Sequence, residues 1–179
     1  MKIISGKYKG RNLLGFNIDG TRPTMDRVKT SLFAMIQNYI PDAIVLDLFA
    51  GSGALGIEAL SEGAKQVVFV DNNIKAIKII NKNIENINID NEDFLIIKND
   101  YQRFLTSNDL TFDIIFLDPP YKTDYINEAL MLIRDKELLN NRGIIVCETD
   151  NPKRINKLDY EVLNEKKYGD KYIVILKKV

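Results

Sequence analysis

Residues 44–56 read IVLDLFAGSGALG, and this stretch carries the strongest structural signal in the chain. An apolar run ends at Asp47, glycines stand at positions 51, 53 and 56, and a helical pattern continues to Ser61. A G-x-G-x-x-G sequence between a strand and a helix is typical of a loop that binds a nucleotide-like ligand. The stretch therefore predicts the start of a mostly parallel sheet, with a ligand seated at this loop.

After this loop, short apolar runs alternate with amphipathic stretches. The apolar runs predict strands at 44–48, 66–70, 94–98, 112–117 and 143–147. Apolar residues at helical spacing predict helices at 54–61, about 74–86 and about 125–133. Strands that alternate with helices form right-handed βαβ units, with helices on both faces of the sheet. The fold class is therefore α/β, with a Rossmann-like, doubly wound arrangement.

The two ends of the chain carry other patterns. Alternating polar and apolar residues at 160–167 and 171–177 predict an antiparallel hairpin that closes one edge of a seven-stranded sheet. Residues 2–4 and 12–14 flank a glycine-rich turn and predict a small N-terminal appendage. Thr24 fits as the N-cap of a following amphipathic helix. Its apolar face would contain Val28, Leu32, Met35 and Ile36.

Length and composition limit the possible classes of protein. With 179 residues we expect a single domain, and 45% hydrophobic with 28% charged residues exclude a disordered chain. The chain has no His, which excludes His-based acid–base catalysis, Ser-His-Asp triads and His-ligated metals. One Cys excludes a disulfide framework and fits a reducing compartment. We expect no membrane-spanning segment, since no apolar run approaches about 18 residues. We also expect a cytoplasmic protein with no metal.

The formal net charge of zero conceals an uneven distribution. Residues 1–30 carry a net charge of +5 and residues 151–179 a net charge of +4, whereas residues 31–150 carry −9. Basic ends around an acidic middle indicate termini that attract anions. Charge scattered by chance over a solvated surface remains an alternative on this observation alone.

Two carboxylates indicate which ligand the glycine loop binds. Asp71 stands twenty positions after Gly51, at the end of the next predicted strand, where it would hold a ribose. Asp47 would repel a pyrophosphate and attract the ammonium group of S-adenosylmethionine. At about 4 Å and an effective dielectric constant near 20, that difference in sign is worth roughly 4 kcal/mol each way. We therefore expect S-adenosylmethionine rather than a dinucleotide.

The predicted cofactor-binding residues come from the loop, from the ends of the next two strands and from the N-terminal segment. Asn99 and Asp100 could meet the adenine, although a solvated turn would explain this pair as well. The predicted set is Thr24, Asp47, Phe49, Ala50, Gly51, Ser52, Gly53, Asp71, Asn72, Asn99 and Asp100.

The sequence Asp118-Pro119-Pro120-Tyr121 directly follows the fourth predicted strand. Two consecutive prolines fix their φ angles and donate no N–H. Asp118 and the Pro119 carbonyl could accept both N–H groups of an exocyclic amine, and Tyr121 could stack on the base for about 1–3 kcal/mol. Cys147 lies within an apolar strand, so a covalent thiol adduct is not favoured. We expect Asp118, Pro119, Pro120 and Tyr121 to carry the chemistry.

Taken together, these motifs resemble class I methyltransferases and, within them, the RsmD family of bacterial 16S rRNA guanine-N2 methyltransferases. The resemblance covers essentially the whole chain. It is carried by residues 4–11, by 21–24 with 26–28, by 46–56, by 118–121 and by 167–170. Asp71 and Asn99 depart from the pattern, since many relatives have Glu and Gly at these positions.

The resemblance implies methylation of a guanine N2 amine in 16S rRNA, on an assembling small ribosomal subunit. It also implies one methyltransferase domain over 1–179, with an appendage at 1–22 and a catalytic core at 23–179. The basic N-terminal segment would then contact RNA phosphates, with Arg22 as an alternative partner of the cofactor carboxylate. The predicted RNA-binding residues are Lys7, Lys9, Arg11, Arg22 and Arg27.

Two other functions are compatible with the same motifs. A DNA adenine-N6 methyltransferase uses the same Pro-Pro chemistry, but such enzymes usually add a target-recognition segment for which this chain has little room. A non-catalytic nucleotide-binding or RNA-binding domain could also keep the fold. The intact Asp118–Tyr121 sequence beside an intact glycine loop favours an enzyme.

Overall fold

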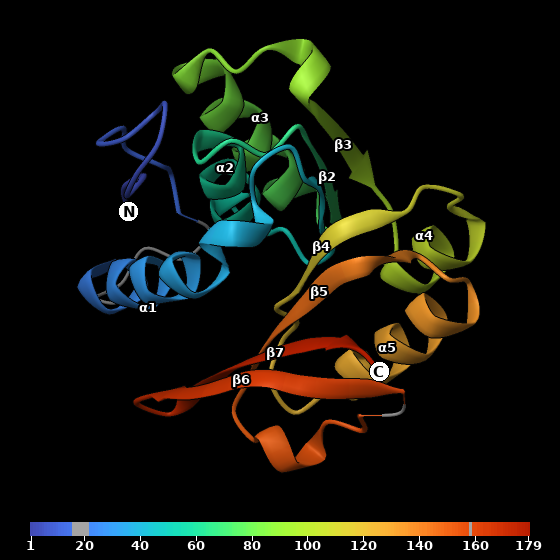
Figure 1. Cartoon of the computed structure of the whole chain (residues 1–179). Coiled ribbons are helices and arrows are strands. Elements are labelled where there is room, and N and C mark those ends of the chain that lie inside the picture. Colours follow the sequence, from blue (N-terminus) through green and yellow to red (C-terminus); the bar gives the residue numbers. More distant parts are fainter. Residues whose placement is uncertain (16–21, 158) are drawn as a thin grey trace.

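The structure, a computed structural model, describes residues 1–15, 22–157 and 159–179, with the side chains of the first helix described from Met25 onward. Within these residues, seven strands form one sheet in the order β3-β2-β1-β4-β5-β7-β6 (Figure 1). β1 to β5 pair in parallel, whereas β7 is antiparallel to β5 and β6. This confirms the predicted fold. The strands are β1 (Ile44–Asp47), β2 (Gln66–Asp71), β3 (Phe94–Lys98), β4 (Phe112–Leu117), β5 (Leu139–Thr149), β6 (Tyr160–Tyr168) and β7 (Lys171–Lys178).

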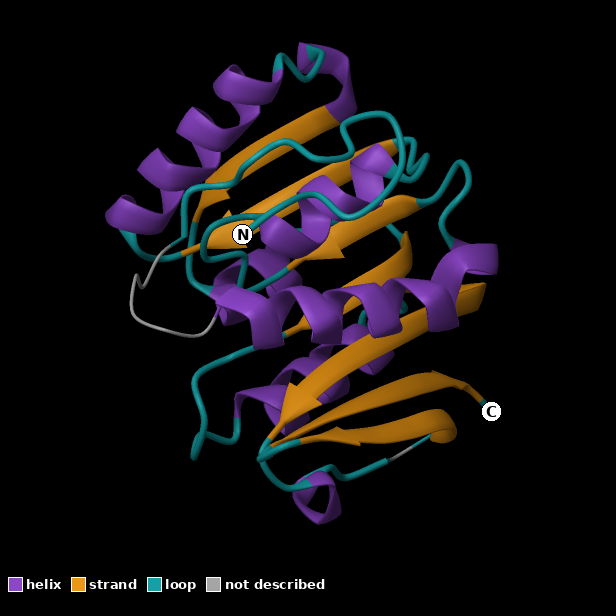
Figure 2. Ribbon diagram, turned by 90° about the vertical axis from the view of Figure 1, so that its left-hand side faces the viewer, coloured by secondary structure: helices purple, strands orange, loops and turns teal. Residues whose placement is uncertain are grey.

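Helices cover both faces of the sheet (Figure 2). One face is covered by α1 (Arg22–Ile36), α2 (Ala54–Ser61) and α3 (Ile74–Ile87), and the other by α4 (Tyr101–Ser107) and α5 (Tyr125–Asp135). Short 3-10 turns are η1 (Gln37–Tyr39), η2 (Asn91–Asp93) and η3 (Pro152–Arg154). No helix among the described residues is long and apolar enough to cross a lipid bilayer.

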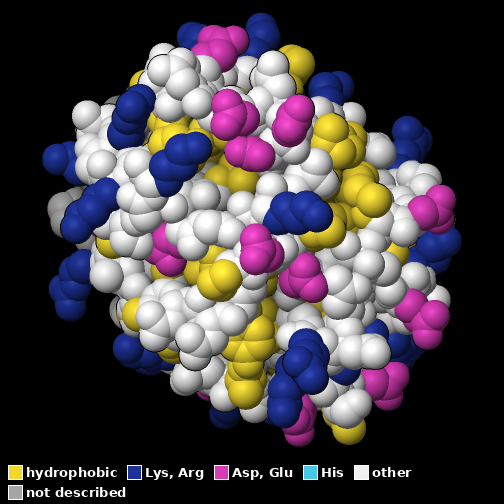
Figure 3. All heavy atoms as spheres, turned by 45° about the horizontal axis from the view of Figure 1, so that its top comes forward, with side chains coloured by type: hydrophobic (Ala, Val, Ile, Leu, Met, Phe, Trp, Pro, Cys, Tyr) yellow, Lys and Arg dark blue, Asp and Glu magenta, His cyan; other side chains and the backbone are white. Residues whose placement is uncertain are grey.

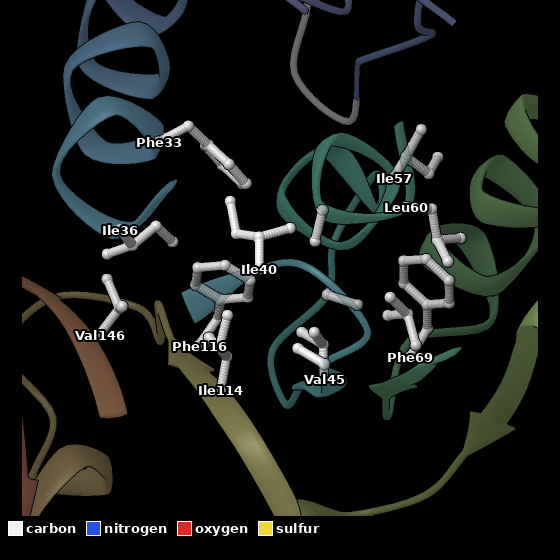
Figure 4. Packing of buried hydrophobic residues seen from close by; sticks show 14 of the residues in the cluster. Phe33, Ile36, Ile40, Val45, Ile57, Leu60, Phe69, Ile114, Phe116 and Val146 are labelled. Atoms are coloured by element: carbon white, nitrogen blue, oxygen red, sulfur yellow. The ribbon is translucent and has the colours of Figure 1, made fainter. Parts of the chain in front are cut away.

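The core lies on both sides of the sheet, which is why its strands read as continuous apolar runs. Ile114 of β4 packs under α1–α3, and the next residue, Ile115, packs under α4 and α5. On the α1 side, Phe33 meets Phe116 of β4 with the ring centres 5.9 Å apart (Figure 4). Because the sheet is packed from both faces, the loops at its carboxyl edge start from fixed positions.

The N-terminal appendage is attached to the end of α2 that lies away from the glycine loop. Lys2 pairs with Asn12 in an antiparallel bridge, as predicted. Gly6 has a φ of +83°, and a Cβ atom at this position would lie 1.8 Å from the carbonyl oxygen of Ser61. Glycine is therefore required here, because any side chain would collide with α2.

A buried carboxylate also holds this appendage. Glu58 of α2 is fully buried, and its two oxygens accept hydrogen bonds from the backbone N–H of Ile4 at 2.9 and 3.1 Å. Lys29 of α1 lies 3.6 Å from Glu58 and donates a hydrogen bond to the carbonyl of Lys2 at 2.7 Å. A buried charge needs such a partner. Glu58 thus joins the appendage, α1 and α2.

The prediction that Thr24 caps the first helix is wrong. The helix begins at Arg22, so Thr24 lies inside its first turn. A proline at position 23 is compatible with this start, because first-turn N–H groups have no acceptor within the helix. The side chain of Thr24 lies outside the described residues, and its predicted cofactor contact stays a prediction.

Two elements differ from the sequence-based expectation. The sequence did not predict α4, which has seven residues and is too short for a helical period to appear. Its start is marked by Asp100, whose Oδ1 accepts hydrogen bonds from the N–H groups of Gln102 and Arg103 at 3.0 and 3.1 Å. β5 begins at Leu139 rather than 143, because Leu139 pairs with Phe112 across a register shift.

Candidate active site

The adjacent strands β1 and β4 mark the point where the chain changes side. After β1 it enters α2 on one face of the sheet, and after β4 it enters α5 on the other. In doubly wound sheets the crevice beyond the carboxyl ends of such strands binds the ligand. The glycine loop and residues 118–121 both begin at this crevice, in agreement with the sequence-based placement.

The glycine loop uses its own amide groups internally. Gly51 and Gly53 have φ angles of +56° and +79°, in the region that favours glycine. The N–H of Gly51 donates to Asp71 Oδ2 at 2.9 Å, that of Gly53 to the Ala50 carbonyl at 2.7 Å, and that of Ala50 to the Val70 carbonyl at 3.0 Å. A dinucleotide pyrophosphate relies on free loop amides. These three are already engaged, which favours a ligand without a pyrophosphate.

Asp47 lies at the end of β1 with 2% of its surface exposed. Its Oδ2 accepts a hydrogen bond from the Gly56 N–H at 3.1 Å. Burial raises the pKa of Asp47 to about 7, the hydrogen bond from Gly56 opposes this rise, and the charge of Asp71 adds to it. The sequence-based argument assumed a fully charged carboxylate. The structure corrects this, since near pH 7 Asp47 is only partly ionised until a cation binds beside it.

Asp71 ends β2, as predicted. Its Oδ2 accepts the Gly51 N–H, and its Oδ1 accepts the Asn73 N–H at 2.8 Å. A carboxylate oxygen can accept a second hydrogen bond, so both oxygens can still bind ribose hydroxyls. Asn72 is exposed beside it. The arrangement fits a diol held at the end of β2.

Asn99 and Asp100 lie next to this position, at the end of β3. The backbone N–H of Asn99 donates to the Asp71 carbonyl at 3.1 Å, which fixes the two strand ends together. The Asp100 carboxylate caps α4, as described above, and Asn99 Oδ1 accepts the Asp100 N–H at 2.9 Å. The pair therefore has a structural role, and its predicted contact with adenine stays a prediction.

Three aromatic rings form a wall beside the glycine loop. Phe49 lies 5.1 Å from Tyr101 and stacks on Tyr125 at 6.2 Å between ring centres, and Tyr101 lies 4.9 Å from Tyr125. The Tyr101 hydroxyl donates a hydrogen bond to Glu128 of α5. Sequence reasoning proposed only Phe49. For Tyr101 and Tyr125, the signal in the sequence was that each is an aromatic residue in the stretch that follows a predicted strand.

Asn83 was also missed by the sequence reasoning. This fully buried side chain of α3 donates to the Ser52 carbonyl at 2.9 Å and to the Leu14 carbonyl at 3.0 Å, and it accepts the Leu14 N–H at 2.8 Å. It therefore ties the glycine loop to the N-terminal appendage. An amide on the apolar stripe of α3, beside Ile80 and Ile84, was the signal that could have found it.

Asp118 follows β4 directly and is partly buried. Burial raises the pKa of Asp118 well above its usual range, Glu148 raises it further, and Lys171 opposes the rise. Tyr121 is 42% exposed. Pro119, Pro120 and Tyr121 line one pocket together with Glu148. Asp118 is not among the residues that line this pocket, so the pocket brings together three of the four residues that the sequence placed here.

Two further residues support this pocket. Glu148, near the end of β5, accepts hydrogen bonds on Oε1 from the Tyr121 hydroxyl at 2.8 Å and from Lys171 Nζ at 2.7 Å. Sequence reasoning missed both Glu148 and Lys171. They are 23 residues apart, and only the antiparallel pairing of β5 with β7 brings them together.

The predicted RNA-binding residues do not form one group. Arg11 donates to the last two carbonyls of α3, both at 3.3 Å, and so caps that helix. Lys7 and Lys9 are exposed near the far end of α2, and Arg27 is exposed on α1. The side chain of Arg22 lies outside the described residues. Helix α2 lies between Lys7 and the glycine loop. Because it has eight residues, it separates the two by about 12 Å along its axis.

Figure 3 shows one face of the molecule, on which Lys and Arg side chains lie mostly toward the rim. Asp and Glu side chains lie between them, nearer the centre of that face. Lys and Arg side chains therefore do not form a single basic patch on this face.

This fold, with a carboxylate beneath the glycine loop and an Asp-Pro-Pro-Tyr exit from β4, defines an S-adenosylmethionine-dependent methyltransferase. The residues fit that cofactor, because Asp71 can accept a diol and Asp47 can face a cation. A family model described as "conserved hypothetical protein 95" matches residues 1–177. The chain belongs to this family, which includes proteins named ribosomal RNA small subunit methyltransferase D, as the resemblance to the RsmD family implied.

Relatives cover nearly the whole chain. The YlbH protein of Bacillus subtilis is 39% identical over 99% of both chains. The ribosomal RNA small subunit methyltransferase D of Haemophilus influenzae is 36% identical over 94% of this chain and 89% of its own. Among solved structures, the Escherichia coli protein yhhF superposes with a TM-score of 0.87 at 29% identity, covering 99% of this chain and 97% of its own.

Proposed function

We propose that this protein transfers a methyl group from S-adenosylmethionine to the exocyclic N2 amine of a guanine in 16S rRNA. The observation that carries the proposal is the position of Asp118-Pro119-Pro120-Tyr121 directly after β4, whose neighbour β1 leads into the glycine loop at the point where the chain changes side. The names of the relatives support the rRNA substrate. The proposed setting is an assembling small ribosomal subunit in the cytoplasm.

The residues that would hold the cofactor lie at two strand ends, those of β1 and β2. Asp71 would accept the ribose hydroxyls, Asp47 would face the methionine ammonium, and Phe49 would contribute apolar surface. When bound, S-adenosylmethionine supplies an electrophilic methyl group on a sulfonium. Asp47 becomes ionised as the cation approaches, because an opposite charge lowers the pKa that burial has raised.

Asp118 is the group that would act on the target amine. Its carboxylate and the Pro119 carbonyl would accept the two N–H groups, which directs the nitrogen lone pair away from them. As positive charge develops on that nitrogen, the carboxylate stabilises it. The raised pKa of Asp118 also suits it to receive the proton afterwards. No His is needed for this sequence of events.

Tyr121 would bind the base itself. Its partly exposed ring offers a stacking surface, and its hydroxyl is held by Glu148. Stacking of a base on an aromatic ring is worth about 1–3 kcal/mol and tolerates any base. Selection of guanine would therefore depend on hydrogen bonds at the pocket rather than on Tyr121.

RNA phosphates would be bound by exposed basic residues outside the pocket. Lys7, Lys9 and Arg27 are exposed and available for this role, with Arg22 as a further candidate. Arg11 would contribute less, because its guanidinium already caps α3. Each phosphate contact adds to the salt dependence of binding.

The test uses small ribosomal subunits and protein-free 16S rRNA from cells that lack this gene. Each substrate is incubated with the protein and S-adenosylmethionine, digested to nucleosides and analysed by mass spectrometry. We expect one additional 2-methylguanosine per rRNA molecule, formed about 10²–10³-fold more slowly by Asp118→Ala. Methylation of DNA adenine instead, or of no nucleic acid, would overturn the proposal.

A further inference from the structure

Three side chains from separate parts of the chain form a closed cluster at the pocket that Pro119, Pro120 and Tyr121 line. Glu148 belongs to β5, Lys171 to β7, and Tyr121 to the loop after β4. Glu148 Oε1 accepts hydrogen bonds from Lys171 Nζ at 2.7 Å and from the Tyr121 hydroxyl at 2.8 Å. Lys171 Nζ also lies 5.5 Å from the centre of the Tyr121 ring. Each member therefore contacts the other two.

This cluster is a costly way to support a loop. The Glu148 side chain is only 14% exposed, and it lies near a second carboxylate, Asp118, which its charge affects. Taking a carboxylate out of water and placing it near another negative charge is unfavourable unless a cation compensates. Lys171 supplies that cation. An exposed tyrosine hydroxyl could instead bond to water at no such cost.

The hydroxyl of Tyr121 determines how its ring is held. The residue is in an irregular loop, and its ring is partly exposed, so packing alone does not fix the ring. Hydrogen bonds to charged groups are stronger than those between neutral groups. Glu148 thus gives the ring one orientation beside Asp118.

We propose that Glu148 and Lys171 are positioning residues for methyl transfer, with Glu148 orienting the ring of Tyr121 under the target base and Lys171 offsetting the charge of Glu148 in favour of the ionised form of Asp118. This inference rests on the proposed function.

The charges around Asp118 give the two residues opposite effects. Glu148 and Asp47 disfavour its ionised form, whereas Lys171 favours it, and Tyr121 is a neutral neighbour held between Glu148 and Lys171. Burial lowers the pKa of Lys171, but its hydrogen bonds to Glu148 and Tyr121 outweigh this and raise it, so Lys171 stays charged. Removing the cation should raise the pKa of Asp118, and removing the Glu148 charge should lower it.

The experiment measures single-turnover methyl transfer to small ribosomal subunits between pH 5 and 9. Saturating S-adenosylmethionine removes the pH dependence of cofactor binding through Asp47, so the acid side of the profile then follows the ionisation of Asp118. We expect Lys171→Met to move this acid limb to higher pH by about one unit. We expect Glu148→Gln to move it in the opposite direction. Lys171→Arg keeps the charge and should retain the position of the limb.

Tyr121→Phe separates orientation from charge. It keeps the ring but loses the hydrogen bond to Glu148, and we expect a rate about tenfold lower with an unmoved acid limb. Lys177→Met is the matched control, because Lys177 lies on β7 like Lys171 but forms its 2.7 Å pair with Glu161 of β6, away from the pocket. It should leave both rate and limb unchanged, and thermal denaturation of every variant reports on folding.

A second measurement needs no methyl transfer. Carbon-13 NMR of the Asp118 carboxyl and the Tyr121 ring follows ionisation and ring order in the protein alone. The inference is overturned if Lys171→Met and Glu148→Gln shift the Asp118 titration in the same direction, or if neither shifts it. If these shifts occur and the parent protein methylates no RNA, the proposed function fails while the charge balance at Asp118 stands.

Discussion

Asp47 makes cofactor affinity dependent on pH. Its pKa is about 7 in the protein without ligand, because burial outweighs the hydrogen bond from Gly56. If only the ionised form binds the methionine ammonium, about half of the molecules are competent at pH 7 and about one in eleven at pH 6. Affinity should therefore be about tenfold weaker at pH 6 than at pH 8.

Isothermal titration calorimetry with S-adenosylhomocysteine, the stable product, measures this directly. Titrations in two buffers of different ionisation enthalpy also count protons, and binding near pH 6 should release close to one proton. Asp47→Asn keeps an acceptor for the Gly56 N–H but cannot ionise. Its affinity should be uniformly weak and flat with pH. If the parent protein binds S-adenosylhomocysteine with the same affinity at every pH and releases no proton, the role of Asp47 is refuted.

The same pKa predicts how stability changes with pH. The folded pKa of Asp47 is raised above its unfolded value of 3.8, so the folded state binds the proton more tightly. The contribution is favourable below about pH 4 and is lost as pH rises toward 7. Thermal denaturation of Asp47→Asn should show less of this loss than the parent protein, both measured without ligand.

Other predictions concern the cofactor, the appendage and RNA. Asp71→Ala should weaken cofactor binding by about 1–3 kcal/mol in calorimetry without unfolding the protein, and unchanged affinity would remove its ribose role. Gly6→Ala should lower the melting temperature clearly more than Gly10→Ala, which has the same φ of +83° but no atom within 4 Å of the added Cβ. Equal effects would mean that the contact with α2 is not what requires glycine. Replacing Arg27 by Gln should flatten the salt dependence of RNA binding by about one unit of slope, and an equal slope would exclude a phosphate contact there.

The fold could be predicted from the sequence because local patterns determine it. The ends of α2, β3 and β4 coincide with the predicted ranges, since each run is apolar and bounded by turn or capping residues. By contrast, α4 was missed because it is shorter than two helical turns. Elements long enough to show their period were found, and a short one was not.

The position of a site residue was predictable only where the residue ends a strand or directly follows one. Asp47, Asp71 and Asp118 were placed correctly, because the carboxyl ends of parallel strands meet at one edge. Glu148 and Lys171 were not found, since their contact depends on the order of β5 and β7 in the sheet. The charge of Asp47 was misjudged for a related reason. The position of Asp47 at the end of its strand could be predicted from the sequence. Its raised pKa could not, because that pKa depends on how deeply the folded chain buries the side chain.

The measurement that tests the central claim most directly is single-turnover methyl transfer by Asp118→Ala, with cofactor affinity and melting temperature measured on the same preparation. Loss of a preorganised group that stabilises developing charge commonly costs about 2.7–4 kcal/mol. We predict a rate about 10²–10³-fold lower, with cofactor affinity nearly unchanged. A variant that forms 2-methylguanosine at the parent rate would contradict the assignment of Asp118 as the group that binds the target amine.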